Sequence, residues 1–252
     1  MLSILRARWQ QGHRTISYPD SAPLVPDRLR GLPAFRADLC RQKCAACIEA
    51  CPTEAITNQD GIRIDLGRCI FCNACVEVCP SGALNFTNDH RLAVRRREHL
   101  TVGQREIELA AELNSEMMRI FGRSLKLRQV SSGGCNGCEV DVNVLTTVVF
   151  DLSRFGINIV ASPRHADGLI VTGPITTNMK LATLKTYAAV PAPKLVIAVG
   201  ACAISGGVYR DHPEQNNGIT DILPVNLYIP GCPPHPITIL DGLLRLLGRV
   251  KK

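Results

Sequence analysis

Aromatic residues are scarce in this chain of 252 residues, of which only 4% are Phe, Trp or Tyr. So few aromatic side chains give little material for the stacking surfaces that bind single-stranded nucleic acid. The sequence also contains no P-loop of the form G-x₄-G-K-[ST], and no Ser–His–Asp arrangement is visible in it. We therefore expect no nucleic-acid partner, no P-loop nucleotide site and no serine-based hydrolysis.

Long apolar runs are missing as well. No run reaches the roughly 18 residues that a membrane-spanning helix needs. The N-terminal residues lack the continuous apolar stretch of a secretory signal. We expect no signal peptide and no transmembrane helix, and hence a reducing compartment in which cysteines serve as ligands rather than as disulfides.

Positive charge is concentrated at the start of the chain. The formal net charge is +7, and residues 1–43 contain eight Lys or Arg against three Asp or Glu. A basic segment can face nucleic acid, an anionic membrane or an acidic partner, and charge alone does not choose among these. Residues 1–9 predict a short amphipathic helix, which suits either a membrane interface or contact with a partner protein.

The twelve cysteines form three groups of four, with no thiol left over. Two groups are copies of one unit, because CIEACPTEAIT (47–57) aligns with CVEVCPSGALN (75–85) at an offset of 28 residues. The copies hold Cys40, Cys44, Cys47 and Cys51 in the first, and Cys69, Cys72, Cys75 and Cys79 in the second. The third group is dispersed and consists of Cys135, Cys138, Cys202 and Cys232.

The repeated spacing is that of bacterial ferredoxins with two [4Fe–4S] clusters, in which the Cys-Pro cysteine of one copy ligates the cluster of the other. We assign the first cluster to Cys40, Cys44, Cys47 and Cys79. We assign the second cluster to Cys69, Cys72, Cys75 and Cys51. Zinc is the alternative, but zinc sites usually use two separated pairs of cysteines. One extra residue between Cys40 and Cys44 departs from the pattern, and its effect on the first cluster stays open.

The second half of the chain alternates short apolar runs with helical patterns, which predicts an α/β layer with a parallel sheet. Sites in such sheets form outside the carboxyl ends of the strands. The dispersed cysteines follow three predicted strands, so we expect them to converge on a third cluster at one sheet edge. The expected strands cover residues 125–130, 158–161, 169–172, 195–199 and 227–229. The expected helices lie near residues 139–155, 178–188 and 237–247.

The expected fold is an α+β ferredoxin-like two-cluster domain followed by an α/β flavodoxin-like domain with a parallel sheet. Residues 1–37 form a basic N-terminal arm, and residues 38–87 form the ferredoxin domain. Residues 88–125 are a connector that includes a helix over 104–121, and residues 126–252 form the α/β domain with one cluster.

Four motifs carry a family resemblance: SSGGCNGCEVDV (131–142), ASPRHADGLIVTG (161–173), GACAISGG (200–207) and YIPGCPP (228–234). They resemble the small subunit of energy-converting, membrane-bound [NiFe] hydrogenases, especially of the formate hydrogenlyase type. They are more distantly similar to the complex I 20 kDa subunit. The first half, with both cysteine repeats, resembles the ferredoxin-like partner in the same complexes, so the chain looks like a fusion of the two.

The resemblance implies a non-catalytic electron-transfer subunit with three [4Fe–4S] clusters, peripheral on the cytoplasmic face of the cell membrane. The dispersed cysteines would hold the proximal cluster, facing a large subunit with a Ni–Fe site. The implied partners are that large subunit, membrane subunits, and a donor such as formate dehydrogenase, carbon monoxide dehydrogenase or ferredoxin. Glu139 and Asp141 would aid proton movement, orient the large subunit or balance a helix N-terminus. Arg164, His165 and Asp167 fit loop hydrogen bonding and subunit contact.

One local difference favours a hydrogenase over complex I. Complex I has two adjacent cysteines at the first ligand position, whereas this chain has Cys135-Asn-Gly-Cys138. Two alternatives stay open. One is a subunit of a complex I-like quinone or sulfur-compound oxidoreductase, and the other is a standalone polyferredoxin electron carrier.

Overall fold

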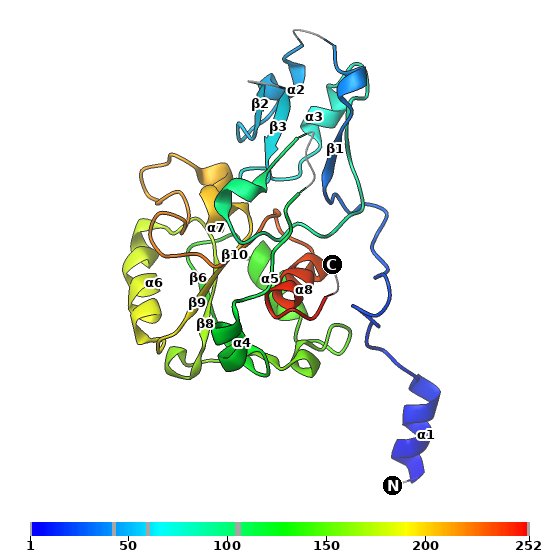
Figure 1. Ribbon diagram of the computed structural model, residues 1–252, viewed down its shortest axis with the longest axis vertical. Helices are drawn as coiled ribbons and strands as arrows, with labels where there is room; N and C mark the ends of the chain where they lie inside the picture. The colour runs from blue at the N-terminus through cyan, green and yellow to red at the C-terminus, as the bar shows by residue number, and fades with distance from the viewer. Residues whose placement is uncertain (1, 42–43, 59–60, 104–106, 251–252) are drawn as a thin grey trace.

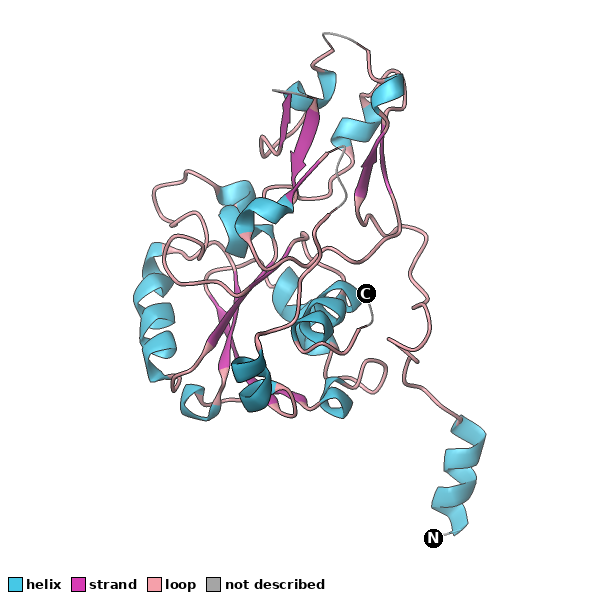
Figure 2. Cartoon of the chain, viewed as in Figure 1, coloured by secondary structure: helices cyan, strands magenta, loops and turns pink. Residues whose placement is uncertain are grey.

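The computed structural model describes residues 2–41, 44–58, 61–103 and 107–250. An α/β body forms its lower part in Figure 1, a smaller part rich in cysteine lies above it, and the N-terminal helix α1 (Leu2–Gln11) extends away from both. Figure 2 shows that the smaller part and the arm consist mostly of loops, with only short strands and helices. No helix within the described residues is both long enough and apolar enough to cross a bilayer.

The α/β body is built on a parallel sheet of five strands. The strands are β6 (Leu125–Ser131), β7 (Ile157–Ile159), β8 (Gly168–Thr172), β9 (Leu195–Val199) and β10 (Leu227–Ile229). Their order is β10-β9-β8-β6-β7, and every pair is parallel. With β6 counted as the first strand, this is the 2-1-3-4-5 order of flavodoxin-like folds. The predicted parallel α/β fold is confirmed.

Helices cover both faces of this sheet, with α6 (Thr177–Ala189) on one side in Figure 1 and α5 (Gly137–Val144) and α8 (Pro236–Leu246) on the other. Strands β8 and β9 are buried along their whole length, because both of their faces are covered. All eleven residues of α8 are buried, so this helix is a central element of the core. The short helix α7 (Ala201–Ser205) follows β9 at the sheet's upper edge.

The smaller part repeats one short pattern of structure. Helix α2 (Ala46–Glu49) leads to strand β2 (Ile56–Asn58), and helix α3 (Ala74–Glu77) leads to strand β4 (Leu84–Phe86) at the same offset of 28 residues. Strand β4 pairs with β1 (Pro33–Phe35) in an antiparallel two-stranded sheet. The sequence repeat is therefore also a structural repeat.

The second small sheet runs in the order β2-β3-β5, with β3 (Ile62–Asp65) in the middle. Strand β5 (Thr101–Val102) belongs to the predicted connector, and it follows the 3₁₀ helix η2 (Arg97–Leu100). The connector thus contributes an edge strand to the cysteine-rich part.

The helix predicted over 104–121 is wrong in its first part. Helix α4 covers only Ser115–Phe121, residues 107–114 have no regular structure, and residues 104–106 lie outside the described residues. The apolar periodicity arises because Ala110 and Leu113 are buried through tertiary contacts, with their N–H groups donating to Ala93 O (2.8 Å) and Leu246 O (3.0 Å). The helix begins only where the Asn114 side chain accepts a hydrogen bond from Met117 N and caps it.

Two other boundaries also differ from the prediction. The helix expected over 139–155 ends at Val144, and only a 3₁₀ turn, η3 (Leu152–Phe155), follows it. The hydroxyls of Thr146 and Thr147 donate to the carbonyls of the preceding turn, and such bonds, together with β-branched residues, disfavour a longer helix. The strand expected over 158–161 begins earlier and covers only Ile157–Ile159.

The arm is fixed to the α/β body by a buried polar group. The Tyr18 hydroxyl donates to Asp241 Oδ1 at 2.5 Å, and Arg245 Nε donates to Asp241 Oδ2 at 2.8 Å. Asp241 is fully buried, so its carboxylate depends on these two donors.

Tyr18→Phe leaves one oxygen of a buried carboxylate without a donor. We expect the free energy of unfolding to fall by about 1–3 kcal/mol, the usual cost of a buried polar group that loses its partner. Urea denaturation measures this change. Tyr209→Phe, at a residue that is 44% exposed, is the matched control. Equal stability of the two variants would contradict the account.

Candidate metal centres

One cavity in the smaller part is lined by four cysteines from both repeats. Three come from the first repeat, and the fourth is the Cys-Pro cysteine of the second. These residues are Cys40, Cys44, Cys47 and Cys79. The structure thus brings together the four side chains that the spacing assigns to the first cluster.

A second cavity has the reciprocal composition. Here the second repeat supplies three cysteines and the first repeat supplies its Cys-Pro cysteine. The lining cysteines are Cys51, Cys69, Cys72 and Cys75. These are the four side chains assigned to the second cluster.

Backbone N–H groups point at the sulfurs in the same way in both repeats. Ala55 N donates to Cys51 Sγ at 3.2 Å, and Ala83 N donates to Cys79 Sγ at 3.3 Å. Phe71 N adds a third such bond, to Cys69 Sγ at 3.4 Å. Donors of this kind stabilise thiolates and raise the reduction potential of a bound cluster.

The thiols of each cavity lie within electrostatic reach of one another. Burial raises the pKa of Cys69 to about 12 and that of Cys75 to about 11, and the other thiols of the second cavity add to both shifts. The pKa of Cys47 is raised by burial and by the three other thiols of the first cavity. At Cys79, burial acts to raise the pKa, but backbone N–H donors of the following turn outweigh it and lower the pKa. Bound iron would replace the protons of these thiols.

The dispersed cysteines gather at the carboxyl edge of the parallel sheet. Cys135 precedes α5, Cys138 lies in its first turn, Cys202 lies on α7 directly after β9, and Cys232 follows β10. Burial raises the pKa of Cys138, and the other three thiols of the group raise it further. The loops that follow β6, β9 and β10 therefore carry all four cysteines to the carboxyl edge of the sheet, and their binding of one cluster stays a prediction.

Glycines let the backbone approach these sulfurs. A Cβ on Gly200, where φ is +90°, would lie 2.5 Å from Cys138 Sγ, and one on Gly207 would lie 2.7 Å from Cys202 Sγ. Any side chain at these positions would occupy the space beside the thiols. Four thiols at one sheet edge are a donor set that fits a metal cluster held by thiolates.

In each of the two cysteine cavities, the four thiols surround a space and do not approach a single point closely enough to bind one ion. Within the described ranges, no three His, Cys, Asp or Glu side chains form a group that could hold a single metal ion. A [4Fe–4S] cluster is bound at four corners, one thiolate for each iron, and a cavity with four thiols around it fits that group.

The three cysteine groups are arranged in series. The Cys47 thiol of the first group raises the pKa of Cys75 in the second. Cys232 of the third group lines one cavity together with Ile70 and Phe71, which lie between Cys69 and Cys72 of the second group. The second group therefore lies between the first and the third. Cys72, Cys135 and Cys232 are exposed.

The carboxylates singled out by the sequence have different surroundings. Glu139 is buried and accepts hydrogen bonds from Ser131 Oγ and Thr172 Oγ1, both at 2.7 Å, so it joins α5 to the ends of β6 and β8. Asp141, whose pKa is raised by burial, lines a larger cavity that also contains Cys232.

The SPRHAD turn lies at the opposite end of the sheet from the thiols. Asp167 Oδ2 accepts from Lys126 N at 2.7 Å, at the start of β6, while Arg164 and His165 are exposed on the 3₁₀ turn η4 (Pro163–His165). This geometry fits loop hydrogen bonding and brings none of the three residues to the cysteines.

Sequence reasoning missed His235. Its Nδ1 accepts from Ile237 N at 3.2 Å and caps α8, and the side chain lines the same open cavity as Cys232 and Asp141. The sequence did contain a signal for it: in the motif Cys-Pro-Pro-His, His235 stands three residues after Cys232, the last cysteine of the third group.

Each repeat supplies one cysteine to the site of the other repeat, so substitution of that cysteine should affect the other site. Cys51→Ser is expected to remove the spectroscopic signal of the second cluster, although Cys51 lies in the first repeat, because its thiol lines the second cavity. Cys79→Ser should remove the signal of the first cluster for the same reason. Electron paramagnetic resonance of the reduced variants distinguishes the two signals. If each variant loses the cluster of its own repeat, the assignment of both cavities is wrong.

Comparison with known proteins gives relatives for both halves of the chain. Residues 135–246 match the family of the NADH ubiquinone oxidoreductase 20 kDa subunit, and residues 62–85 match the 4Fe–4S binding domain. A probable membrane-bound hydrogenase subunit of Pyrococcus furiosus is 42% identical over 139 residues, which is 55% of this chain and 83% of that protein.

Two further relatives share the second half. Formate hydrogenlyase subunit 7 of Escherichia coli is 40% identical over 145 residues, or 58% of this chain and 57% of that protein. An NADH-quinone oxidoreductase subunit of Bacteroides thetaiotaomicron is 42% identical over 115 residues, or 45% of this chain and 58% of that protein. The chain thus spans somewhat more than half the length of these two relatives.

Proposed function

The chain belongs to the family of the NADH ubiquinone oxidoreductase 20 kDa subunit, and from this premise we propose that it is the electron-transfer subunit of a membrane-associated, energy-converting [NiFe] hydrogenase. Three [4Fe–4S] clusters would relay electrons to or from the Ni–Fe site of a large subunit. The observation that carries the proposal is the serial arrangement of three groups of four cysteines, which ends at an exposed sheet edge.

The protein's own contribution is to place and tune these carriers. When bound, each cluster supplies a one-electron redox centre. The crossed cysteine pairs hold the first two sites within one small unit, so that they lie close together. Backbone donors to Cys51, Cys69 and Cys79 set the electrostatic environment of the sulfurs.

The third site is the one that faces a partner. Cys135 and Cys232 are exposed, and Val140 on the adjoining helix is 48% exposed. A large subunit docked on this edge would exclude water from the third cluster and bring its own redox centre close to it. The donor would then meet the cysteine-rich part at the opposite end, and formate dehydrogenase, carbon monoxide dehydrogenase and ferredoxin all suit that position.

Reconstitution with the large subunit tests the proposal. The complex is expected to evolve hydrogen from reduced viologen and to lack quinone reduction, because Cys135 and Cys138 are separated by two residues rather than adjacent. Quinone reduction alone would favour the complex I-like alternative, which the relative from Bacteroides also supports. A chain that elutes alone with all its clusters would favour a standalone polyferredoxin.

Helix α1 is the part of the chain best suited to hold it on the cytoplasmic face of a membrane. It buries no residue, and Leu2 and Trp9 are 83% and 85% exposed. Isolated helices of this length are marginal in water, so α1 needs a surface to support it. Arg6 and Arg8 favour an anionic surface, to which each basic side chain adds about 1 kcal/mol.

Deletion of residues 2–11 is expected to reduce co-sedimentation with vesicles that contain phosphatidylserine by about tenfold or more, because two Arg side chains and the apolar contacts of α1 are lost together. The melting temperature should not change, since the helix buries none of its residues against the rest of the chain. Neutral phosphatidylcholine vesicles are the control. Undiminished binding of the shortened chain to anionic vesicles would show that α1 has another role.

A further inference from the structure

A short strap, residues 94–102, joins the two units that hold the cysteines. At one end, Val94 extends the edge of the parallel sheet by two backbone hydrogen bonds with Tyr228, of 3.0 and 2.8 Å. At the other end, Thr101 and Val102 form β5 on the edge of β3. The strap therefore pairs with a sheet at each of its ends, and it is a structural junction rather than a free linker.

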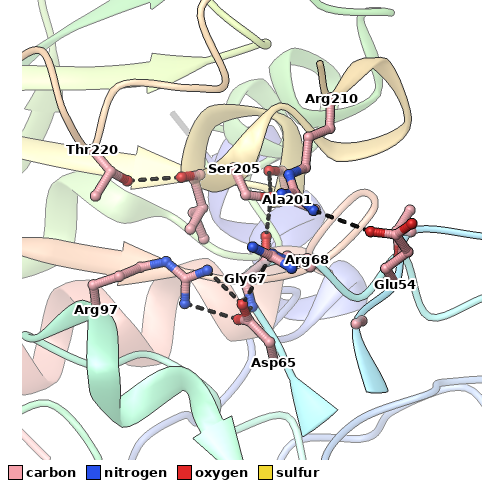
Figure 3. Close-up of polar contacts among 12 residues, drawn as sticks. Glu54, Asp65, Gly67, Arg68, Arg97, Ala201, Ser205, Arg210 and Thr220 are labelled. Atoms are coloured by element: carbon pink, nitrogen blue, oxygen red, sulfur yellow. Dashed lines mark hydrogen bonds and ion pairs between the residues drawn. The ribbon is translucent and has the colours of Figure 1, made fainter. Parts of the chain in front are cut away.

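An ion pair fixes the middle of the strap, as Figure 3 shows. Arg97 Nη1 and Nη2 donate to Asp65 Oδ1 and Oδ2 at 2.8 and 2.6 Å, and both side chains are mostly buried. The planar fork of arginine matches both carboxylate oxygens, which restricts orientation as well as distance. Asp65 Oδ1 also accepts from Gly67 N at 2.9 Å, so the same carboxylate holds the turn that begins at residue 66.

That turn touches the α/β body at Gly67. The Ser205 hydroxyl of α7 donates to Gly67 O at 2.8 Å (Figure 3). A Cβ on Gly67 would lie 2.8 Å from Ile204 Cγ2 and 3.0 Å from Leu100 Cδ1. The contact leaves no space for a side chain at residue 67, and only glycine allows the turn to lie this near to α7.

Both partners of this contact are close in sequence to proposed cluster ligands. Gly67 is two residues before Cys69 of the second site, and Ser205 is three residues after Cys202 of the third site. The second and third sites are also neighbours in space, because Ile70 and Phe71 of the second site line the same cavity as Cys232 of the third. A shift at the Gly67–Ser205 contact would therefore move one set of ligands relative to the other.

We propose that Gly67, Ser205 and the Asp65–Arg97 pair are positioning residues that set the separation of the second and third clusters. This inference rests on the proposed function, since it concerns the relay between those clusters. Electron transfer slows steeply with the distance between carriers, so the junction between the two units sets the rate of the step that crosses it. Arg210 and Glu54 form another ion pair between the two units (3.7 Å). Because Glu54 is exposed to solvent, this pair contributes little to the stability of the junction.

The test uses the full chain with its clusters assembled anaerobically. Magnetic coupling between reduced clusters is measured by electron paramagnetic resonance in Gly67→Ala and Ser205→Ala. Thr220→Val is the matched control, because the Thr220 hydroxyl donates to Ile204 O (2.7 Å) within one unit and bridges nothing. Coupling between the first and second clusters is the internal control, since both lie on the same side of the junction.

We expect both junction variants to keep the iron content of the wild type and the first–second coupling, and to show a measurably changed second–third coupling. Electron transfer across the junction should slow by about tenfold or more, since a misplacement of about 1 Å can cost a reaction about a hundredfold. Thr220→Val should behave as the wild type. If Gly67→Ala does not fold, Ser205→Ala decides the matter.

Unchanged second–third coupling in fully loaded junction variants would overturn the inference. A wild-type chain with fewer than three clusters would overturn the proposed function instead. In that case hydrogen exchange over residues 65–69 still tests the junction: faster exchange in Gly67→Ala than in Thr220→Val supports it, and equal exchange overturns it.

Discussion

Removal of iron by a chelator under anaerobic conditions is expected to unfold the cysteine-rich part of the chain, residues 33–102, while the α/β body stays folded. The smaller part has no described strand longer than four residues, and its helices α2 and α3 have four residues each. Its centre contains two cavities lined with thiols. Without metal, buried thiols such as Cys47 and Cys75 would have no ligand at the centre of this part, and the apolar side chains that pack around them would lose that support.

The α/β body has no such dependence on metal. Strands β8 and β9 and the helix α8 are fully buried, and the third group of thiols lies at its edge rather than at its centre. Binding of structural zinc supplies about 10–16 kcal/mol of folding free energy in small domains. Removal of iron should cost the smaller part a comparable amount of folding free energy, and we expect only this part to unfold.

Hydrogen exchange measured before and after chelation separates the two units. We expect protection to disappear over the smaller part and to persist in β8, β9 and α8, and to return when iron and sulfide are added back. Retained protection in both parts, or simultaneous loss from both, would contradict this division.

The second large effect is expected from Cys202→Ser. Its thiol is one of four at the sheet edge, and burial with the neighbouring thiols raises its pKa to about 11, so a bound metal is what keeps it deprotonated near neutral pH. The variant should lose the third cluster, with iron falling from about twelve to about eight per chain. Hydrogen evolution by the complex with the large subunit should then be abolished.

The variant has two controls. Thr220→Val removes a hydrogen bond to Ile204 O, close to Cys202 in the chain, and should keep all clusters and full activity. Reduction of the first and second clusters by dithionite should be normal in Cys202→Ser, because their ligands are untouched. Hydrogen evolution by Cys202→Ser at the wild-type rate would show that electrons reach the large subunit along another route.

The features that the sequence predicts well are those with a local or repeated pattern. The offset of 28 residues between the cysteine copies recurs in α2 and α3 and in β2 and β4. The apolar runs after residue 125 predict all five strands of the sheet, and the signal is continuous in β8, β9 and β10 because these strands are buried on both faces.

The features that sequence reasoning misses depend on residues far apart in the chain. Tyr18 and Asp241 are separated by 223 residues, and no pattern near either one indicates their contact. Gly67 and Ser205 are also far apart in the chain, and no pattern near either one indicates that they form a junction. The error over residues 107–114 has a related cause, since apolar spacing that suits a helix is satisfied there by backbone contacts to other elements.

The most direct test of the account is the iron and acid-labile sulfide content of the full chain purified anaerobically, combined with electron paramagnetic resonance during stepwise reduction. Three groups of four thiols predict about twelve irons per chain and three separately reducible signals, one of which is lost in Cys202→Ser. A content of about four irons, or spectra in which no signal depends on the third group of cysteines, would contradict it.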